Sequence, residues 1–311
     1  MLIFMLTQGC LERLVFEKEY ATACPRPDDC SDYTPPPIIE VESPCVENNV
    51  LNIMTWNIEW FPKDEQRTME YVKTIIEQVD VDILAIQELH ERDLFDTMLD
   101  SMPEYAGYYE STWFAGLAYI YKKEVVDVHS IFEVYTTSSY WSAFPRSPMV
   151  MDMTAYGKRY LLVNNHLKCC GDGMLDMQDP DDEEWRRLDA MNLLFEYIEG
   201  VLPNEKVVVL GDLNDNIAEE TSNNVFQAFL EAPEQYRFVD MDIAMGGIDE
   251  WSFPSWPSHL DHILVSDEIF PQLESSLVYT LKIDQYLRGG FYEYDRSISD
   301  HRPVGICLTA L

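Results

Sequence analysis

The stretch KVVVLGDLND, residues 206–215, decides the fold of this chain. Its apolar part, Val207–Leu210, is typical of a buried strand. The apolar run stops at Gly211, and the glycine, aspartate and asparagine residues from there on favour a turn. A strand that stops in this way places polar side chains at the edge of its sheet. The sequence therefore predicts a polar site where this strand ends.

Five other segments place polar residues at the end of an apolar run. They are TWNIEW (55–60), IQEL (86–89), NNHLK (164–168), LDHILVS (260–266) and SDHRPV (299–304). Together with GDLND (211–215), they supply asparagine, glutamate, aspartate and histidine side chains from widely separated parts of the chain. We expect these strand ends to meet in one cleft, which is the arrangement of a catalytic site at the edge of a sheet.

Strand-like and helix-like segments are mixed from residue 50 onward. Apolar residues recur every three or four positions in 65–79 and in 184–199, which predicts two helices with one buried face each. Strands are predicted at 50–56, 82–87, 117–122, 148–154, 160–165, 206–211, 260–265 and 303–309. Helices that alternate with apolar strands indicate an α/β protein in which helices cover the sheets.

Charge and hydrophobicity limit the classes of partner. The chain has 311 residues, of which 47% are hydrophobic, so it can bury one large core. Its 56 acidic and 21 basic residues give a net charge of −35, which repels nucleic acid and other polyanions at long range. Six of the cations lie in residues 146–187, about twice the average density of the chain. No apolar run of about 18 residues is present, so no transmembrane helix is predicted.

The first 49 residues differ from the rest. Residues 1–10, MLIFMLTQGC, resemble a truncated export signal with a lipoprotein-type Gly-Cys junction, which would anchor the chain to a membrane through lipidated Cys10. Residues 11–49 contain CPRPDDCSDYTPPP and predict an irregular arm or tether before a catalytic domain at 50–311. Six further cysteines suit disulfides outside the cell or on its outer surface. The alternative is a cytoplasmic protein that begins at Met1 and has free thiols.

The order, content and spacing of the six motifs resemble the endonuclease/exonuclease/phosphatase superfamily of metal-dependent phosphoesterases, over roughly residues 50–309. The resemblance implies a four-layer α/β/β/α sandwich, an α+β arrangement of two packed mixed sheets flanked by helices. It places the site at one edge, where strands from both sheets end. It also implies in-line attack of an activated water on phosphorus, without a covalent intermediate.

The resemblance assigns a metal site to Asn57, Glu88 and Asp300. Glu88 ends the apolar run DILAIQE, where a buried carboxylate is costly unless it binds a partner. A salt bridge to a neighbouring Arg or Lys is the alternative for this residue. Asn57 would orient the carboxylates, and Asp300 would reach the metal directly or through water. Oxygen ligands suit Mg²⁺, and Mn²⁺ or Ca²⁺ remain alternatives.

Four residues resemble catalytic groups of the superfamily. Asp212 would orient or deprotonate the attacking water, and Asn214 would bind the phosphate. Asp261 would fix the tautomer of His301 and stabilise its protonated form, so that the other ring nitrogen can donate to a phosphate oxygen. The neighbouring His262 is expected to point to the opposite side of its strand.

Three further residues are assigned to the substrate. His166 resembles the histidine that donates to the phosphate or the leaving oxygen in the nuclease and sphingomyelinase branches. Arg146 and Lys168 would contact the substrate phosphate, and the planar donor fork of arginine suits this role. A surface salt bridge is the alternative for Arg146. Cys169 and Cys170 come directly after Lys168, and the sequence does not decide whether they pair with each other.

We therefore expect a monomeric, Mg²⁺-dependent hydrolase of phosphodiesters that most resembles extracellular nuclease-like bacterial enzymes, with nucleic acid as a candidate substrate. The alternative within the enzyme class is a phosphatase or a phospholipase C-like phosphodiesterase. Its substrate would be a small phosphorylated metabolite or a lipid headgroup, which the net charge accommodates more easily. The alternative from another class is a non-catalytic binding module of the same fold. Such a module would be expected to have lost at least one of Glu88, Asp212, Asp261 and His301, and all four are present.

Overall fold

A computed structural model describes residues 39–47, 49–111 and 115–309. The expected export signal with Cys10, and most of the arm at 11–49, lie outside the described residues. Two six-stranded sheets form the centre of the structure. The first has the strand order β11 (Leu277–Thr280), β12 (Val304–Thr309), β1 (Val50–Phe61), β2 (Ile83–Leu89), β4 (Gly116–Lys122) and β3 (Tyr105–Tyr108). The second has the order β5 (Val126–Glu133), β6 (Met149–Ala155), β7 (Lys158–His166), β8 (Val207–Asp212), β10 (Asp261–Ser266) and β9 (Tyr236–Phe238).

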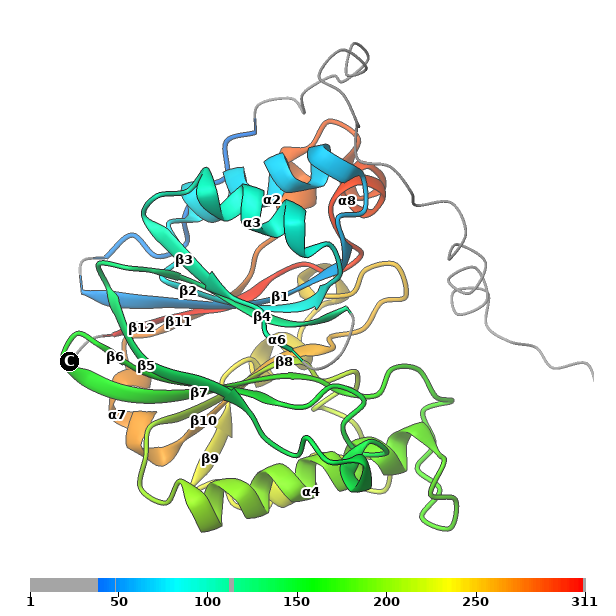
Figure 1. Cartoon of the computed structure of the whole chain (residues 1–311). Coiled ribbons are helices and arrows are strands. Elements are labelled where there is room, and N and C mark those ends of the chain that lie inside the picture. Colours follow the sequence, from blue (N-terminus) through cyan, green and yellow to red (C-terminus); the bar gives the residue numbers. More distant parts are fainter. Residues whose placement is uncertain (1–38, 48, 112–114, 310–311) are drawn as a thin grey trace, which may run out of the picture. The chain divides into compact units, whose positions relative to one another are not determined.

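Helices cover the outer face of each sheet (Figure 1). The first sheet carries α2 (Glu65–Val79), α3 (Arg92–Asp100) and α8 (Gly290–Ser297). The second carries α4 (Glu183–Val201), and short helices occur at α5 (Gln227–Leu230), α6 (Met241–Ala244) and α7 (Phe270–Leu273). The expected four-layer α/β/β/α sandwich of two mixed sheets is confirmed. Among the described helices, none combines the length and the hydropathy needed to cross a bilayer.

Strand β1 shows why the sheets stack. Its side chains alternate between two faces, and both faces are buried. Leu51 and Ile53 belong to the core between the two sheets, whereas Met54 and Trp56 pack in the core beneath the helices of the first sheet. A strand that is apolar on both faces cannot lie at the surface, so it requires one layer above it and one below it.

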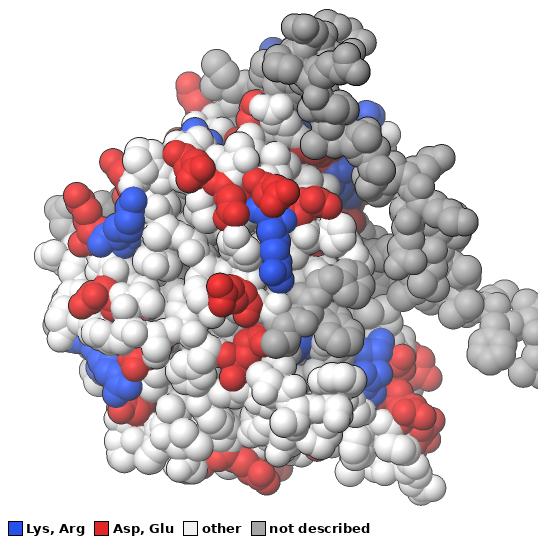
Figure 2. Space-filling view, viewed as in Figure 1, with Lys and Arg blue, Asp and Glu red and all other residues white. Residues whose placement is uncertain are grey.

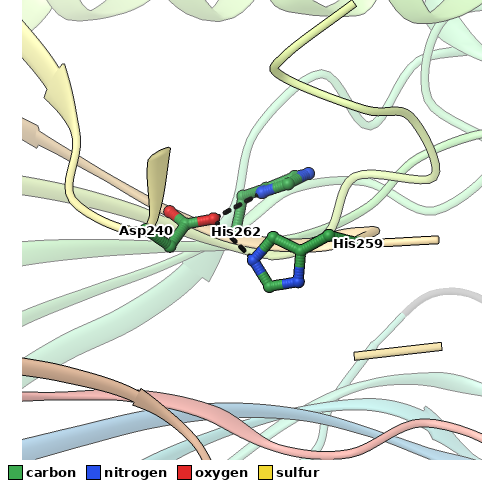
Figure 3. A group of neighbouring side chains, drawn as sticks. All are labelled: Asp240, His259 and His262. Carbon is green, nitrogen blue, oxygen red and sulfur yellow. Dashed lines mark hydrogen bonds and ion pairs between the residues drawn. The ribbon is translucent and has the colours of Figure 1, made fainter. Parts of the chain in front are cut away.

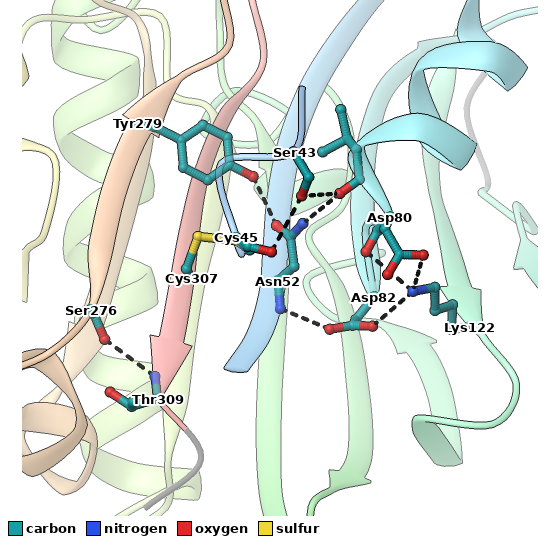
Figure 4. The surroundings of a disulfide bond; sticks show 11 residues. Ser43, Cys45, Asn52, Asp80, Asp82, Lys122, Ser276, Tyr279, Cys307 and Thr309 are labelled. Carbon is teal, nitrogen blue, oxygen red and sulfur yellow. Dashed lines mark hydrogen bonds and ion pairs between the residues drawn. A yellow bond between two sulfur atoms is a disulfide. The ribbon is translucent and has the colours of Figure 1, made fainter. Parts of the chain in front are cut away.

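A disulfide joins the described part of the arm to the last strand (Figure 4). Cys45 is bonded to Cys307 in β12, with 5.5 Å between their Cα atoms. Ahead of Cys45 the chain packs on α2, where the amide of Val41 donates to Gln78 Oε1 at 2.7 Å. Ser43 Oγ donates to the carbonyl of Val79 at 2.6 Å, so this segment is fixed at several points. The sequence indicated disulfides in general but did not identify this pair.

Candidate active site

The ends of three neighbouring strands of the second sheet form one wall of the site. His166 ends β7 and pairs with Asp212, which ends the parallel strand β8. Asp261 begins the antiparallel strand β10 and also pairs with Asp212. Directly paired residues point to the same face of a sheet, so the three side chains lie in a row. All three are buried.

Asn57 links this row to the first sheet. Its Nδ2 donates to Asp212 Oδ2 at 2.9 Å and to Glu88 Oε1 at 3.2 Å. The other Glu88 oxygen accepts from the backbone amide of Trp60 at 3.1 Å. Glu88 has φ 65°, a left-handed conformation that is uncommon for a glutamate. The two expected metal residues from separate strands are therefore in direct contact.

His301 lies against Asp261, and its Nδ1 is 2.7 Å from Asp261 Oδ2. Burial disfavours the charged imidazole, but the carboxylates of Asp261 and Asp212 outweigh burial and hold the pKa of His301 well above its usual value. Its Nε2 is 3.8 Å from Asp212 Oδ2 and 3.9 Å from Asp300 Oδ1. The ring is therefore an imidazolium whose Nε2–H points toward the carboxylates of the site.

Asp212 lies at the centre of the group. Burial raises the pKa of its carboxyl to about 7, the charges of Asp261 and Glu88 act in the same direction, and His301 acts against them. His166 Nε2 is 3.5 Å from Asp212 Oδ2 and 3.9 Å from Glu88 Oε1. A carboxyl with a pKa near neutrality can accept a proton during a reaction at physiological pH.

The donor set fits a hard divalent cation. The carboxylates of Glu88 and Asp300 are of the ligand type that Mg²⁺ prefers. Asn57 turns its Nδ2 toward Glu88 and Asp212, and its Oδ1 accepts from the amide of Glu59 at 2.9 Å, so its side chain orients the carboxylates. Oxygens of Asp212 and Asp261 and a nitrogen of His301 also lie within 4.8 Å of one another. Nδ1 of His301 is bonded to Asp261, so Nε2 is the ring nitrogen that faces the other carboxylates.

Asn214 adjoins the group through its backbone. It has φ 57°, its amide donates to Asp212 Oδ1 at 3.1 Å, and its Nδ2 donates to the carbonyl of Leu167 at 3.2 Å. The contacts described for the two expected phosphate-binding cations lie elsewhere. Arg146 Nε donates to the carbonyl of Ala115 at 3.2 Å. Lys168 Nζ donates to the carbonyl of Cys169 at 2.7 Å and lies 3.6 Å from Glu183.

Sequence reasoning missed the residues that hold the site in place. Ser299 Oγ donates to the carbonyl of Asn57 at 2.6 Å and accepts from the amide of His301 at 3.0 Å. Glu59 Oε2 accepts from the amide of Asp300 at 2.8 Å. Ser299 opens the SDH motif and Glu59 lies within TWNIEW, so their positions inside the motifs were the available signal.

Gly211 has a steric role at the edge of the site. A Cβ atom at this position would lie 2.0 Å from the carbonyl oxygen of Asn165 on the neighbouring strand. Its φ of 144° is likewise a conformation that favours glycine. The close approach of β7 and β8 at this point brings His166 and Asp212 together.

Comparisons with known proteins agree with this geometry. Residues 54–301 match the model of the Endonuclease/Exonuclease/phosphatase family. Among solved structures, D. rerio TDP2 complexed with a single-strand DNA product has a TM-score of 0.60 and 13% identity, with 83% of this chain and 99% of that chain covered. A family protein from Bacteroides thetaiotaomicron has a TM-score of 0.58 and 15% identity, with 84% of this chain and 98% of that one covered.

A mannosyl-6-phosphatase from Bacteroides thetaiotaomicron has a TM-score of 0.55 and 14% identity, with 82% of this chain and 98% of that chain covered. At these identities the likeness to solved structures shows the fold alone. No curated protein matches the sequence.

Proposed function

Because the chain belongs to the endonuclease/exonuclease/phosphatase family, whose members are hydrolases of phosphoester bonds, we propose that it is a Mg²⁺-dependent hydrolase of phosphodiesters. One observation carries this proposal. The amide of Asn57 joins Asp212 to Glu88, and Asp212 in turn faces the imidazolium of His301. A carboxylate for a cation, a group to accept a proton and a group to donate one are thus within a few ångströms of one another.

Each residue can be given a role in the reaction. A divalent cation held by Glu88, with Asn57 and Asp300, would neutralise charge on the phosphate oxygens. Asp212 orients the attacking water and accepts its proton, as its raised pKa supports. His301, kept protonated by Asp261, donates from Nε2 to a phosphate oxygen as negative charge develops there.

Two neighbouring residues complete the assignment. His166 lies on the same wall as Asp212, which supports its proposed role as a donor to the phosphate or the leaving oxygen. Asn214 would bind the phosphate from the turn after β8. Arg146 and Lys168 remain proposed phosphate contacts, although each would have to leave the partner that it now binds.

A small phosphoester is the second candidate substrate, and the surface charge favours it. Acidic and basic side chains are interspersed on the face shown in Figure 2, and the acidic ones predominate. Some of the cations are also paired. Arg159 contacts Asp152 and Glu205 at 2.8 Å, and Lys168 lies 3.6 Å from Glu183. The acidic excess repels a polyanion, whereas a single phosphate group needs only the site itself.

We also propose that the enzyme is an extracellular or surface-bound monomer, anchored through a lipid on Cys10. The Cys45–Cys307 disulfide supports an oxidising compartment, because such bonds are rare in the cytosol. Intact-mass measurement on protein from its native host tests the anchor. A chain that retains Met1 without a lipid would exclude it.

A substrate panel tests the proposed function. DNA, RNA, bis-nitrophenyl phosphate, sphingomyelin and inositol phosphates would each be incubated with Mg²⁺ and with a chelator, beside the variant Glu88→Gln. Cleavage of a diester that needs both Mg²⁺ and Glu88 supports the proposal. Cleavage of monoesters alone would move the assignment to a phosphatase, and no metal-dependent cleavage of any substrate would contradict it.

A further inference from the structure

A second cluster of histidine and aspartate lies behind the proposed site. It consists of Asp240, His259 and His262, all of them without solvent exposure (Figure 3). His262 follows Asp261 on β10 and pairs with Gly211, so it points to the face opposite Asp261. The expected opposite orientation of His262 is therefore observed. The roles proposed above do not use this cluster.

The hydrogen bonds of His262 fix its charge. Its Nδ1 is 2.6 Å from Asp240 Oδ2, and its Nε2 is 2.8 Å from the backbone carbonyl oxygen of Asp215. A carboxylate and a carbonyl can only accept, so both ring nitrogens have to carry protons. Burial acts against this charge, but the neighbouring Asp240 outweighs burial and raises the pKa of His262. The ring is an imidazolium with no remaining donor.

His259 is bonded at both nitrogens as well, but as a neutral ring. Its Nδ1 accepts from the amide of Ser252 at 3.3 Å, and its Nε2 donates to Asp240 Oδ2 at 3.0 Å. The other Asp240 oxygen accepts from the amide of Ile263 at 3.0 Å. The ring nitrogens therefore have no lone pair left for a cation, although three ligand-type side chains meet here. The polar atoms of the cluster therefore bind backbone groups and one another instead of a metal ion.

One arm of the cluster reaches the turn that carries Asp212. His262 binds the carbonyl of Asp215, which lies three residues after Asp212 in the GDLND motif. The side chain of Asp215 is held in turn by Arg187 Nε at 2.7 Å. Arg187 also donates to the carbonyls of Lys168 and Cys170, just after His166. The imidazolium of His262 thus supports the turn from behind.

The other arm reaches the residues around the His301–Asp261 pair. Ser252, whose amide binds His259, accepts at Oγ from the amide of Asp261 at 3.2 Å. The carbonyl of Ser252 accepts from the amide of Arg302 at 2.7 Å, one residue after His301. Both members of the pair are therefore held through the segment that His259 fixes.

We propose that Asp240 is a positioning residue for the whole site, which holds the Asp212 turn through His262 and the Asp261–His301 pair through His259. This inference rests on the proposed function only for the catalytic roles of Asp212, Asp261 and His301. What it says about position can be tested without any activity. It predicts that the two arms respond differently, because each histidine is hydrogen-bonded to only one of them.

Amide hydrogen–deuterium exchange reads the two arms directly. His262→Gln should speed exchange in residues 212–216 by at least about tenfold and in 252–261 by much less, because His262 binds only the first segment, and the two segments meet at the bond from the Leu213 amide to the Leu260 carbonyl. His259→Gln should do the reverse, and Asp240→Asn should affect both segments. The matched controls are His129→Gln, at an exposed histidine bound to Thr154, and Asp152→Asn on β6. Strand β6 should not change in the three cluster variants, and the two controls should leave both segments unchanged.

Several outcomes would overturn the proposal. Equal responses of both segments to each histidine variant would show a general loss of stability instead of two arms. Unchanged exchange in all variants would show that the bonds do not position the loops. If Asp240→Asn fails to fold, the two histidine variants still decide, since they keep the carboxylate. Nitrogen NMR on the wild-type chain adds an independent check, because a His262 ring protonated on one nitrogen only would contradict the bonding described above.

Once a substrate is known, steady-state kinetics test whether the position of the Asp212 turn affects catalysis. In a folded His262→Gln variant, kcat should fall by roughly 10- to 100-fold with KM changed less than about twofold, because the misplaced groups act on the reacting atoms. A changed KM with an unchanged kcat would overturn the positioning role. If the wild-type chain hydrolyses no phosphoester, the exchange and NMR results still stand, so failure of the proposed function is distinguishable from failure of this inference.

Discussion

Strand β10 contributes one residue to each of two histidine–aspartate pairs, Asp261 on one side of the second sheet and His262 on the other. The two pairs differ in how many of their polar atoms already have hydrogen-bond partners. On the inner side, His301 uses Nδ1 for Asp261, while its Nε2 has only the 3.8 and 3.9 Å contacts with Asp212 and Asp300. On the outer side, both nitrogens of His262 are bonded at 2.6 and 2.8 Å. The same pair of residue types has hydrogen-bonding capacity left in one place and is saturated in the other.

The aspartates show the same contrast. Both oxygens of Asp240 accept hydrogen bonds, whereas Asp261 Oδ1 is buried and has no hydrogen-bond partner among the described residues. Buried polar atoms are nearly always satisfied, and exceptions are common at functional sites. Unused hydrogen-bonding capacity, rather than residue type, therefore distinguishes the pair expected to react from the pair that supports it.

The largest effect should come from the cation, which only the inner side can bind. Glu88→Gln, or excess EDTA on the wild-type chain, should lower phosphoester hydrolysis by several orders of magnitude, because the main source of charge neutralisation is lost. The melting temperature of Glu88→Gln should change little. Glu205→Gln, which alters a carboxylate that binds Arg159 away from the site, is the control for charge. Full activity in EDTA would remove the metal from the proposal.

The inner pair should behave as one unit in catalysis. Asp261→Asn and His301→Ala should each lower kcat by roughly 10²- to 10⁴-fold, and the double variant should be no worse than the more damaged single variant. The measurement is steady-state kinetics on a substrate from the panel, with His129→Ala as the control. Penalties that multiply in the double variant would show that the two residues act separately.

The outer pair should behave instead as a stability element. Asp240→Asn leaves a buried imidazolium without its counterion, which should cost about 3–5 kcal/mol in the free energy of unfolding. Asp152→Asn is the matched substitution at an exposed ion pair with Arg159, and should cost under about 1 kcal/mol. Urea denaturation compares the two. Similar costs at both positions would contradict the buried charge assigned to His262.

The smallest effect concerns pH, and its sign follows from the two shifts. The pKa of Asp240 is lowered, with burial opposed by His262 and His259, so its contribution to stability exists above the unfolded value of about 4 and is lost at lower pH. The pKa of His262 is raised, so its contribution is complete below about 6.5 and is lost as pH rises through the folded pKa. The stability difference between wild type and Asp240→Asn should therefore be largest between about pH 4 and 6.5, in denaturation measured across pH. A difference that grows steadily into the alkaline range would contradict this assignment.

The sequence predicted the interior of the fold better than its margins. Helix α2 has the predicted bounds, and the eight predicted strands correspond to the eight inner strands of the two sheets. The four unpredicted strands, β3, β5, β9 and β11, are the edge strands. Three of them have only three or four residues, and β5 is largely exposed. None of the four therefore has the apolar run that marks an inner strand.

The site was predictable where strands end and unpredictable where loops fold. Glu88, Asp212 and Asp261 lie at or next to the ends of inner strands, and they meet Asn57 where the pairing of β1 with β2 shifts register. Their catalytic roles stay a prediction. Arg146 and Lys168 belong to loops whose side chains follow local partners, Ala115 and Glu183, that no pattern in the sequence reveals. Asp240 was missed for a similar reason, since it lies 22 residues before His262 without any shared motif.

The bond between Cys45 and Cys307 also changes the effect of proteolytic cleavage on the molecule. It closes a ring across a sequence separation of 262 residues, and the ring contains every residue assigned to the site. A single cut by a protease anywhere inside this ring leaves both fragments covalently joined, with all twelve strands still held in one molecule. Scission ahead of Cys45 would release whatever precedes it and leave the ring intact. One nick would therefore open the backbone without separating the two parts of the site.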